Sequence, residues 1–259
     1  DLHVQEMSPT PEKALPSARR LQELAPPDAG HLQHMPSHIH ALIGDFDEAT
    51  RCSRLSMATD KRFMANLHRT PFYRTLVCHD VHMLMFAGMQ TGNLADAADA
   101  AIVMAEILEN VLVHPPVTHM DMTLEGYYAT IYHVDVRFGR WQQIAGREFT
   151  GDPAFMPVSH AMHHQPPAMA LAALGRHDEA DMAAADFDAA RARVPAVYAY
   201  FNNQADDILC VGAAMMRGEM AYHAGETEAG FNWLREAVAA EDRLFYTEPR
   251  AWMHPPRHA

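Results

Sequence analysis

Residues 42–50 read LIGDFDEAT: an apolar run ends at a glycine, a short polar turn follows, and a second run with helical periodicity begins. The same pattern of apolar run, glycine and polar turn recurs in MQTGNLADAAD (89–99), VRFGRWQQI (136–144), LAALGRHDEAD (171–181) and AYHAGETEAGF (221–231). A glycine at this place supplies the left-handed backbone conformation that closes a helix. Apolar residues spaced three and four apart are typical of amphipathic helices. Each stretch therefore predicts a helical hairpin.

Small residues follow most of these turns. The fifth residue after the glycine is Ala49, Ala97, Ala180 or Gly230, and only Ile144 departs from this pattern. Small side chains let the paired helices approach closely. Alternating β-branched runs and Asn-Gly or Asp-Gly turns, which favour strands and β-hairpins, are absent from the sequence.

We therefore expect an all-α fold in which residues 1–259 form a single domain. The predicted helices cover residues 11–25, 29–43, 46–66, 71–91, 94–112, 120–138, 140–148, 157–174, 177–193, 206–224, 227–243 and 249–259. Pro115–Pro116 and Pro166–Pro167 should break or kink whatever element contains them.

The composition indicates which partners and which cellular compartment to expect. The chain is 49% apolar, which allows a sizeable core, and its formal net charge of −13 argues against nucleic-acid binding. No apolar run is long enough to cross a membrane. Three widely spaced cysteines favour a reducing, cytoplasmic location. We expect the chain to be a fragment of a longer protein, so an N-terminal targeting signal could have been lost.

The hairpin turns resemble those of tetratricopeptide repeats, in which Gly-x-[Tyr/Phe/Trp]-x-x-Ala joins the two helices of a repeat. GDFDEA and GRWQQI match this turn, with Phe46 and Trp141 two residues after the glycine. GHLQHMPSHI, CHDVHMLMFAGM and EPRAWMHPPRHA further resemble segments of a group of microbial tetratricopeptide-repeat proteins. That group carries GHL-x-HMP-[Ser/Thr]-HI and a later H-[Asn/Asp]-x-H-F, where this chain has Met83 as the last residue. The resemblance implies an α-solenoid with a concave face, and it implies no particular reaction.

Histidines are concentrated in two segments. On a helix, His31, His34 and His38 of GHLQHMPSHIH stand at i, i+3 and i+7 and share one stripe. His79 and His82 of CHDVHM lie one turn apart. Helices 29–43 and 71–91 would be the first helices of adjacent hairpins, so the two stripes should face each other about 8–10 Å apart.

Imidazoles arranged in this way can bind Cu, Zn or Fe. We expect His34, His38, His79 and His82 to be ligands, with His31 or His3 as a fifth ligand or an acid–base group. Asp80 could orient an imidazole from behind. The sequence thus predicts a metalloprotein, with a metal-dependent enzyme as one form of it. The alternative is a non-catalytic scaffold in which the histidines form a structural hydrogen-bond network.

Pro36 leaves two interpretations open. It could open the helix and aim His34 differently from His38. A helix could instead begin at Pro36, where proline is well tolerated, which would place His31 and His34 in a preceding turn and spoil the stripe.

Two weaker candidates lie further along the chain. His160, His163 and His164 precede Pro166–Pro167, so they should lie at a helix end, where they could form a third face of the same site. Asn202 and Asn203 could hydrogen-bond an extended peptide in a concave groove, although a loop turn explains them as well. A peptide, a protein or a small molecule is the partner expected in that groove.

Overall fold

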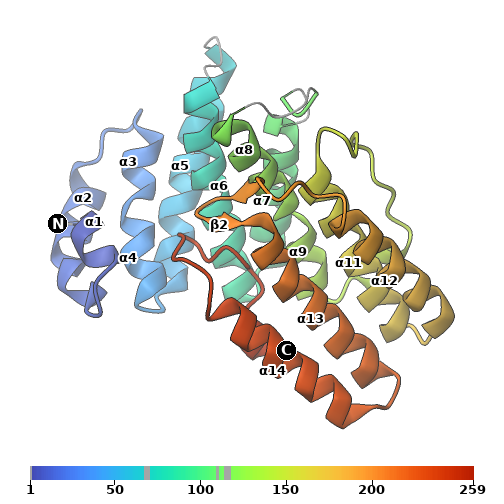
Figure 1. Cartoon of the computed structure of the whole chain (residues 1–259). Coiled ribbons are helices and arrows are strands. Elements are labelled where there is room, and N and C mark those ends of the chain that lie inside the picture. The colour runs from blue at the N-terminus through green and yellow to red at the C-terminus, as the bar shows by residue number, and fades with distance from the viewer. Residues whose placement is uncertain (1, 67–70, 109–110, 114–117) are drawn as a thin grey trace. The chain divides into compact units, whose positions relative to one another are not determined.

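The computed structural model describes residues 2–66, 71–108, 111–113 and 118–259, and the chain is mostly helical (Figure 1). Within these residues the strands are β1 (Ala199–Tyr200) and β2 (Asn203–Gln204), which pair antiparallel. The all-α prediction is confirmed. None of the described helices combines the length and apolar character needed to cross a bilayer.

Contacts divide the chain into two compact units, Asp1–Ile107 and Leu108–Ala259. A single domain over the whole chain therefore stays a prediction. The helices that make up the first unit are α1 (Leu2–Glu6), η1 (Pro11–Ala14), α2 (Leu15–Leu24), α3 (Gly30–His34), α4 (Pro36–Leu42), α5 (Phe46–Asn66), α6 (Pro71–Thr91) and α7 (Leu94–Leu108). The second unit contains, besides the strands, α8 (His119–Ala129), α9 (Tyr132–Arg137), α10 (Trp141–Ala145), α11 (Pro157–Ala173), α12 (His177–Arg191), α13 (Ala205–His223), α14 (Thr227–Glu241) and η2 (Pro256–His258).

All five predicted hairpin glycines close a helix in the left-handed region. Their φ values run from +62° at Gly139 to +85° at Gly225. After Gly44 the amide of Asp45 donates to the carbonyl of His40 at 2.8 Å, and the bond from Arg176 to Leu171 follows Gly175 in the same way. These bonds satisfy carbonyls that the end of a helix leaves without an intrahelical donor. The sequence-based prediction of the turns is confirmed.

Tertiary packing changed several helix boundaries. The predicted helix 120–138 divides into α8 and α9, and the predicted helix 249–259 is reduced to η2. The predicted helix 157–174 is confirmed as α11, which runs through Pro166–Pro167, so the helix end expected at His160–His164 is wrong. Most residues of α11 are buried, so packing on several sides holds the helix although the prolines donate no hydrogen bond. Pro115–Pro116 lies outside the described residues.

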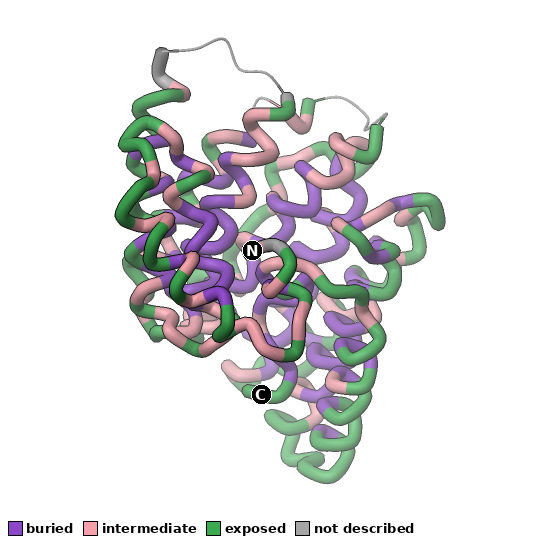
Figure 2. The backbone as a smooth tube through the Cα atoms, turned by 90° about the vertical axis from the view of Figure 1, so that its left-hand side faces the viewer, coloured by how far each residue is buried: buried purple, intermediate pink, exposed green. Residues whose placement is uncertain are grey.

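In the first unit, α6 contacts α3, α4 and α5. Its residues from Val77 to Ala87 are buried, apart from the partly exposed His79. Burial on most sides explains why polar and apolar residues do not separate onto two faces of this helix. Most other helices show buried and exposed stretches in alternation (Figure 2).

The second unit is built on a continuous apolar core. It is formed mainly by α11 and α13, with Tyr200 of β1 and Trp252 of the C-terminal segment fully buried among them. The Trp252 ring lies against Gly212, where an added Cβ would come within 2.8 Å of it. Its indole N–H donates to the sulfur of Met215 at 2.9 Å.

Candidate metal centre

The histidine segment forms two short helices on one line. Met35 joins α3 to α4 with right-handed helical angles, φ −49° and ψ −37°, and its amide donates to the carbonyl of His31 at 3.0 Å. Pro36 begins α4 and lacks an N–H, which divides the hydrogen-bond ladder without turning the chain. A helix does begin at Pro36, but His31 and His34 lie on the helix α3 and the stripe of His31, His34 and His38 survives. That Pro36 aims His34 differently from His38 stays a prediction.

Gly30 lets this segment lie close to α5. A Cβ built on Gly30 would lie 2.1 Å from Oδ1 of Asp60, far inside van der Waals contact. Any larger residue would have to displace the Asp60 carboxylate or move α3 away. Gly30, which begins GHLQHMPSHIH, is therefore explained by its packing against a carboxylate and not by backbone flexibility.

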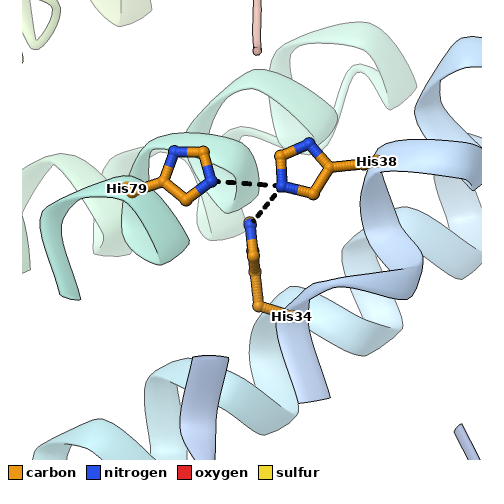
Figure 3. A group of neighbouring side chains, drawn as sticks. All are labelled: His34, His38 and His79. Carbon is orange, nitrogen blue, oxygen red and sulfur yellow. Dashed lines mark hydrogen bonds between the residues drawn. The ribbon is translucent and has the colours of Figure 1, made fainter. Parts of the chain in front are cut away.

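Three imidazoles meet between these helices and α6 (Figure 3). Nε2 of His38 lies 2.8 Å from Nε2 of His34 and 3.1 Å from Nε2 of His79. The ring centroids of His34 and His79 are 4.7 Å apart, so all three pairs are in contact. His34 and His38 are buried, whereas His79 keeps partial exposure to solvent.

Hydrogen bonding alone accounts poorly for this convergence. In a neutral imidazole each ring nitrogen carries either one proton or one lone pair. Nε2 of His38 therefore cannot make well-aligned bonds to both neighbours. Three nitrogens around a tetrahedral zinc ion lie about 3.3–3.4 Å from one another. The two contacts of Nε2 of His38, at 2.8 and 3.1 Å, are a few tenths of an ångström shorter than that spacing.

A buried carboxylate supports the imidazoles from behind. Asp80, which is 1% exposed, lies 2.9 Å from Nδ1 of His31 through its Oδ1. The same oxygen is 3.7 Å from Nδ1 of His34, slightly beyond hydrogen-bond distance. The hydroxyl of Ser56 on α5 donates to Oδ2 of Asp80 at 2.6 Å. A carboxylate beside the far nitrogen of a ligating histidine is a recurrent feature of metal centres.

The polar network continues into α5. Ser56 also lies 3.3 Å from Oδ2 of Asp60, and the hydroxyl of Tyr73 donates to Oδ1 of Asp60 at 2.9 Å. Burial, and then the charge of Asp80, raises the pKa of Asp60 to about 7. Two carboxylates thus lie side by side behind the imidazoles, which gives this region a negative field that favours a cation.

The pKa values of the imidazoles separate them into two kinds. Burial, and then the neighbouring rings, lowers the pKa of His34 and of His79 well below the usual range. Both rings are therefore neutral at pH 7, as metal ligands must be. His31 differs, because its hydrogen bond to Asp80 raises its pKa.

The structure brings some predicted ligands together and leaves others apart. His34, His38 and His79 offer nitrogens within 4.8 Å of one another, and His31 joins His34 and Asp80 in a second such group. His82 is buried in α6 but belongs to neither group, and burial lowers its pKa to about 3. Its ligand role stays a prediction.

The N-terminal helix contributes differently from the prediction. The side chain of His3 lies outside the described residues. Glu6, on the same helix α1, is 8% exposed and places a carboxylate oxygen within 4.8 Å of an imidazole nitrogen of His38. A second carboxylate therefore lies next to a candidate ligand.

Asn202 and Asn203 bond an extended segment, and that segment belongs to the same unit of this chain. Nδ2 of Asn202 donates to the carbonyl of Tyr246 at 3.0 Å. The amide of Asn203 bonds both the N–H and the carbonyl of Phe245, at 2.7 and 3.2 Å. Asn203 is 3% exposed, so its amide already serves the fold. A partner groove at these residues stays a prediction.

Sequence reasoning missed the residues of α5 behind the site. Ser56 and Asp60 are spaced i and i+4 on the predicted helix 46–66, where neither residue belongs to a recognisable ligand motif. Two small or acidic polar residues at that spacing on a core-facing stripe were the available indication. No protein-family model matches this chain, and neither a curated protein nor a solved structure matches it.

Proposed function

We propose that this chain is a metalloprotein that binds a divalent transition metal ion through His34, His38 and His79. The observation that carries the proposal is the convergence of three Nε2 atoms, at 2.8 and 3.1 Å, in which Nε2 of His38 cannot make well-aligned hydrogen bonds to both neighbours. Imidazole is a common ligand for Zn, Cu and Fe, and three such ligands leave at least one position free.

The free position gives the centre a chemical use. His79 is partly exposed, and the side chain of His31 is 35% exposed beside it, so water reaches this side of the cluster. A metal ion with three histidine ligands lowers the pKa of a bound water or polarises a substrate oxygen. The pair of His31 and Asp80 lies where it could exchange a proton with such a water. A metal-dependent enzyme acting through activated water is therefore the form of the proposal that these residues favour.

The architecture that we propose is a tetratricopeptide-like array, related to the microbial group named above. Its support is the repeated hairpin, in which a left-handed glycine is followed five residues later by buried Ala49, Ala97 or Ala180. We place the protein in a reducing compartment such as the cytoplasm, because Cys52, Cys78 and Cys210 form no disulfide.

The test is metal binding by protein that is purified without a polyhistidine tag and stripped with a chelator. Titration calorimetry and elemental analysis should give one tightly bound Zn²⁺ or Cu²⁺ per chain. Co²⁺ should produce the intense visible bands of a tetrahedral site, and azide should shift those bands if one position is open. Bound ion should raise the melting temperature.

Two variants separate the centre from adventitious binding. His38→Ala and His79→Ala should each weaken tight binding by at least about tenfold. His177→Ala removes an exposed histidine on α12 and should change nothing. If the stripped protein takes up no metal and its stability is unchanged by any ion, the histidines are structural and the scaffold alternative is favoured.

A further inference from the structure

A second pair of imidazoles converges in the other unit. His160 and His164 lie one turn apart on α11, with their Nε2 atoms 3.2 Å from each other. Their ring centroids are 4.8 Å apart and the rings are nearly perpendicular, at 85°. Both residues are partly exposed, so an ion could reach the two nitrogens from solvent.

The neighbours of this pair form one apolar wall and one charged side. Phe149 packs edge-on against His160 at 5.0 Å between ring centroids. The negative charge of Asp186 on α12 acts on both imidazoles, whereas the positive charge of Arg193 acts on His160. The carboxylate therefore favours a cation at both rings, and the guanidinium opposes it at one of them.

The contact between the two nitrogens limits the states that the pair can take. Both cannot carry protons at 3.2 Å, since two N–H groups would then point at each other. Either one ring donates to the other, or both lone pairs face a common point. Histidines at i and i+4 on a helix reach one metal ion without any change of backbone.

We propose that His160 and His164 form a second divalent metal site, in which two imidazoles on one turn of α11 bind the ion and water completes its coordination. His163 lies nearby, with 5.4 Å between its ring centroid and that of His164. Among the described residues, no third ligand atom within 4.8 Å completes a group with this pair. The site therefore binds its ion more weakly than the three-histidine centre does.

The test removes the first centre so that the two sites can be distinguished. In the His38→Ala/His79→Ala background, Zn²⁺ titration should still give one equivalent of weaker binding. Long-range ¹H–¹⁵N spectra of the histidine rings should show Nε2 of His160 and His164 shifting together as Zn²⁺ is added. These shifts do not depend on whether the first centre binds metal.

Variants at the pair complete the experiment. Adding His164→Ala or His160→Ala to that background should weaken the remaining equivalent at least about tenfold, while His177→Ala should leave it unchanged. Asp186→Asn should weaken it several-fold. Circular dichroism shows whether each variant is folded. The proposal is overturned if the background binds no Zn²⁺, or if its Zn²⁺ survives both histidine substitutions with the ring nitrogens of His160 and His164 unshifted.

Discussion

Residues 1–107 bury several ionisable groups next to groups of their own kind, whereas in residues 108–259 several buried acids lie next to arginines or backbone amides. In the first unit, imidazole meets imidazole at His34 and His38, and carboxylate meets carboxylate at Asp60 and Asp80. In the second unit Asp135 is paired with Arg140 and Arg147.

Glu125 and Glu241 extend this contrast. Glu125 accepts the amides of Val158 and Ser159 at the start of α11, at 2.8 and 2.9 Å. Glu241 lies 3.3 Å from both Arg250 and Arg257. The ion pairs of Asp135 and Glu241 satisfy their charges within the fold. Clusters of imidazoles or of carboxylates leave part of their burial cost uncompensated. A bound metal ion would compensate it. His160 and His164, which are partly exposed, repeat the contact of imidazole with imidazole in the second unit.

The largest test of the contrast removes apolar bulk from the second unit. Trp252→Ala should lower the free energy of unfolding by about 3–5 kcal/mol, because the ring is 1% exposed and its loss leaves a cavity beside Gly212. Trp233→Ala, at a side chain that is 42% exposed, should cost less than about 1 kcal/mol. Urea denaturation measures both. Equal losses would mean that the apolar core does not dominate this unit.

The second test concerns the pH dependence that a buried acid confers. Burial raises the pKa of Glu125 to about 7 from an unfolded value of 4.5. Between these values the folded chain holds a proton that the unfolded chain has lost, so stability falls as pH rises from 4.5 to 7. The loss should be roughly 3 kcal/mol.

Glu125→Gln should flatten this slope, as measured by urea denaturation at several pH values between 4.5 and 8. Asp60→Asn should flatten a further part, because the pKa of Asp60 is also raised to about 7. An unchanged slope in both variants would show that neither acid titrates on folding.

The third test sharpens the account of the first unit. Gly30→Ala should cost about 1–3 kcal/mol, because the new methyl group would meet the Asp60 carboxylate at 2.1 Å. Asp60→Ala, made in the same chain, should relieve most of that loss in a double-mutant cycle. If the two losses simply add, the contact between Gly30 and Asp60 does not set the approach of α3 to α5.

The smallest expected effect should be the same in both units. Gly44→Ala and Gly175→Ala each place a methyl group in open space, but at φ values of +81° and +74°. Each should lower the free energy of unfolding by about 1–2 kcal/mol, from the left-handed conformation alone. A clearly larger loss at one glycine would reveal a tertiary role that the hairpin geometry does not require.

Most of the helical framework could be predicted from the sequence. The bounds predicted for the helices at 46–66 and 71–91 are those of α5 and α6, and the hairpin glycines take the expected conformation. The errors fall where packing overrides local preference, as at Pro166 within α11 and in the short C-terminal helix η2. Periodicity could also place His34, His38 and His79 on facing stripes.

The sequence by itself determined the hairpins, because a helix and its glycine stop are made by hydrogen bonds between residues a few positions apart. Only the tertiary structure decided which of the candidate histidines meet, and that Ser56 and Asp60 lie behind Asp80. Ser56 on α5 donates a hydrogen bond to Asp80 on α6, and Asp80 in turn contacts His31 on α3, so three separate helices contribute to this network. Such partners depend on the distance and rotation between packed helices, which the pattern within a single helix does not specify.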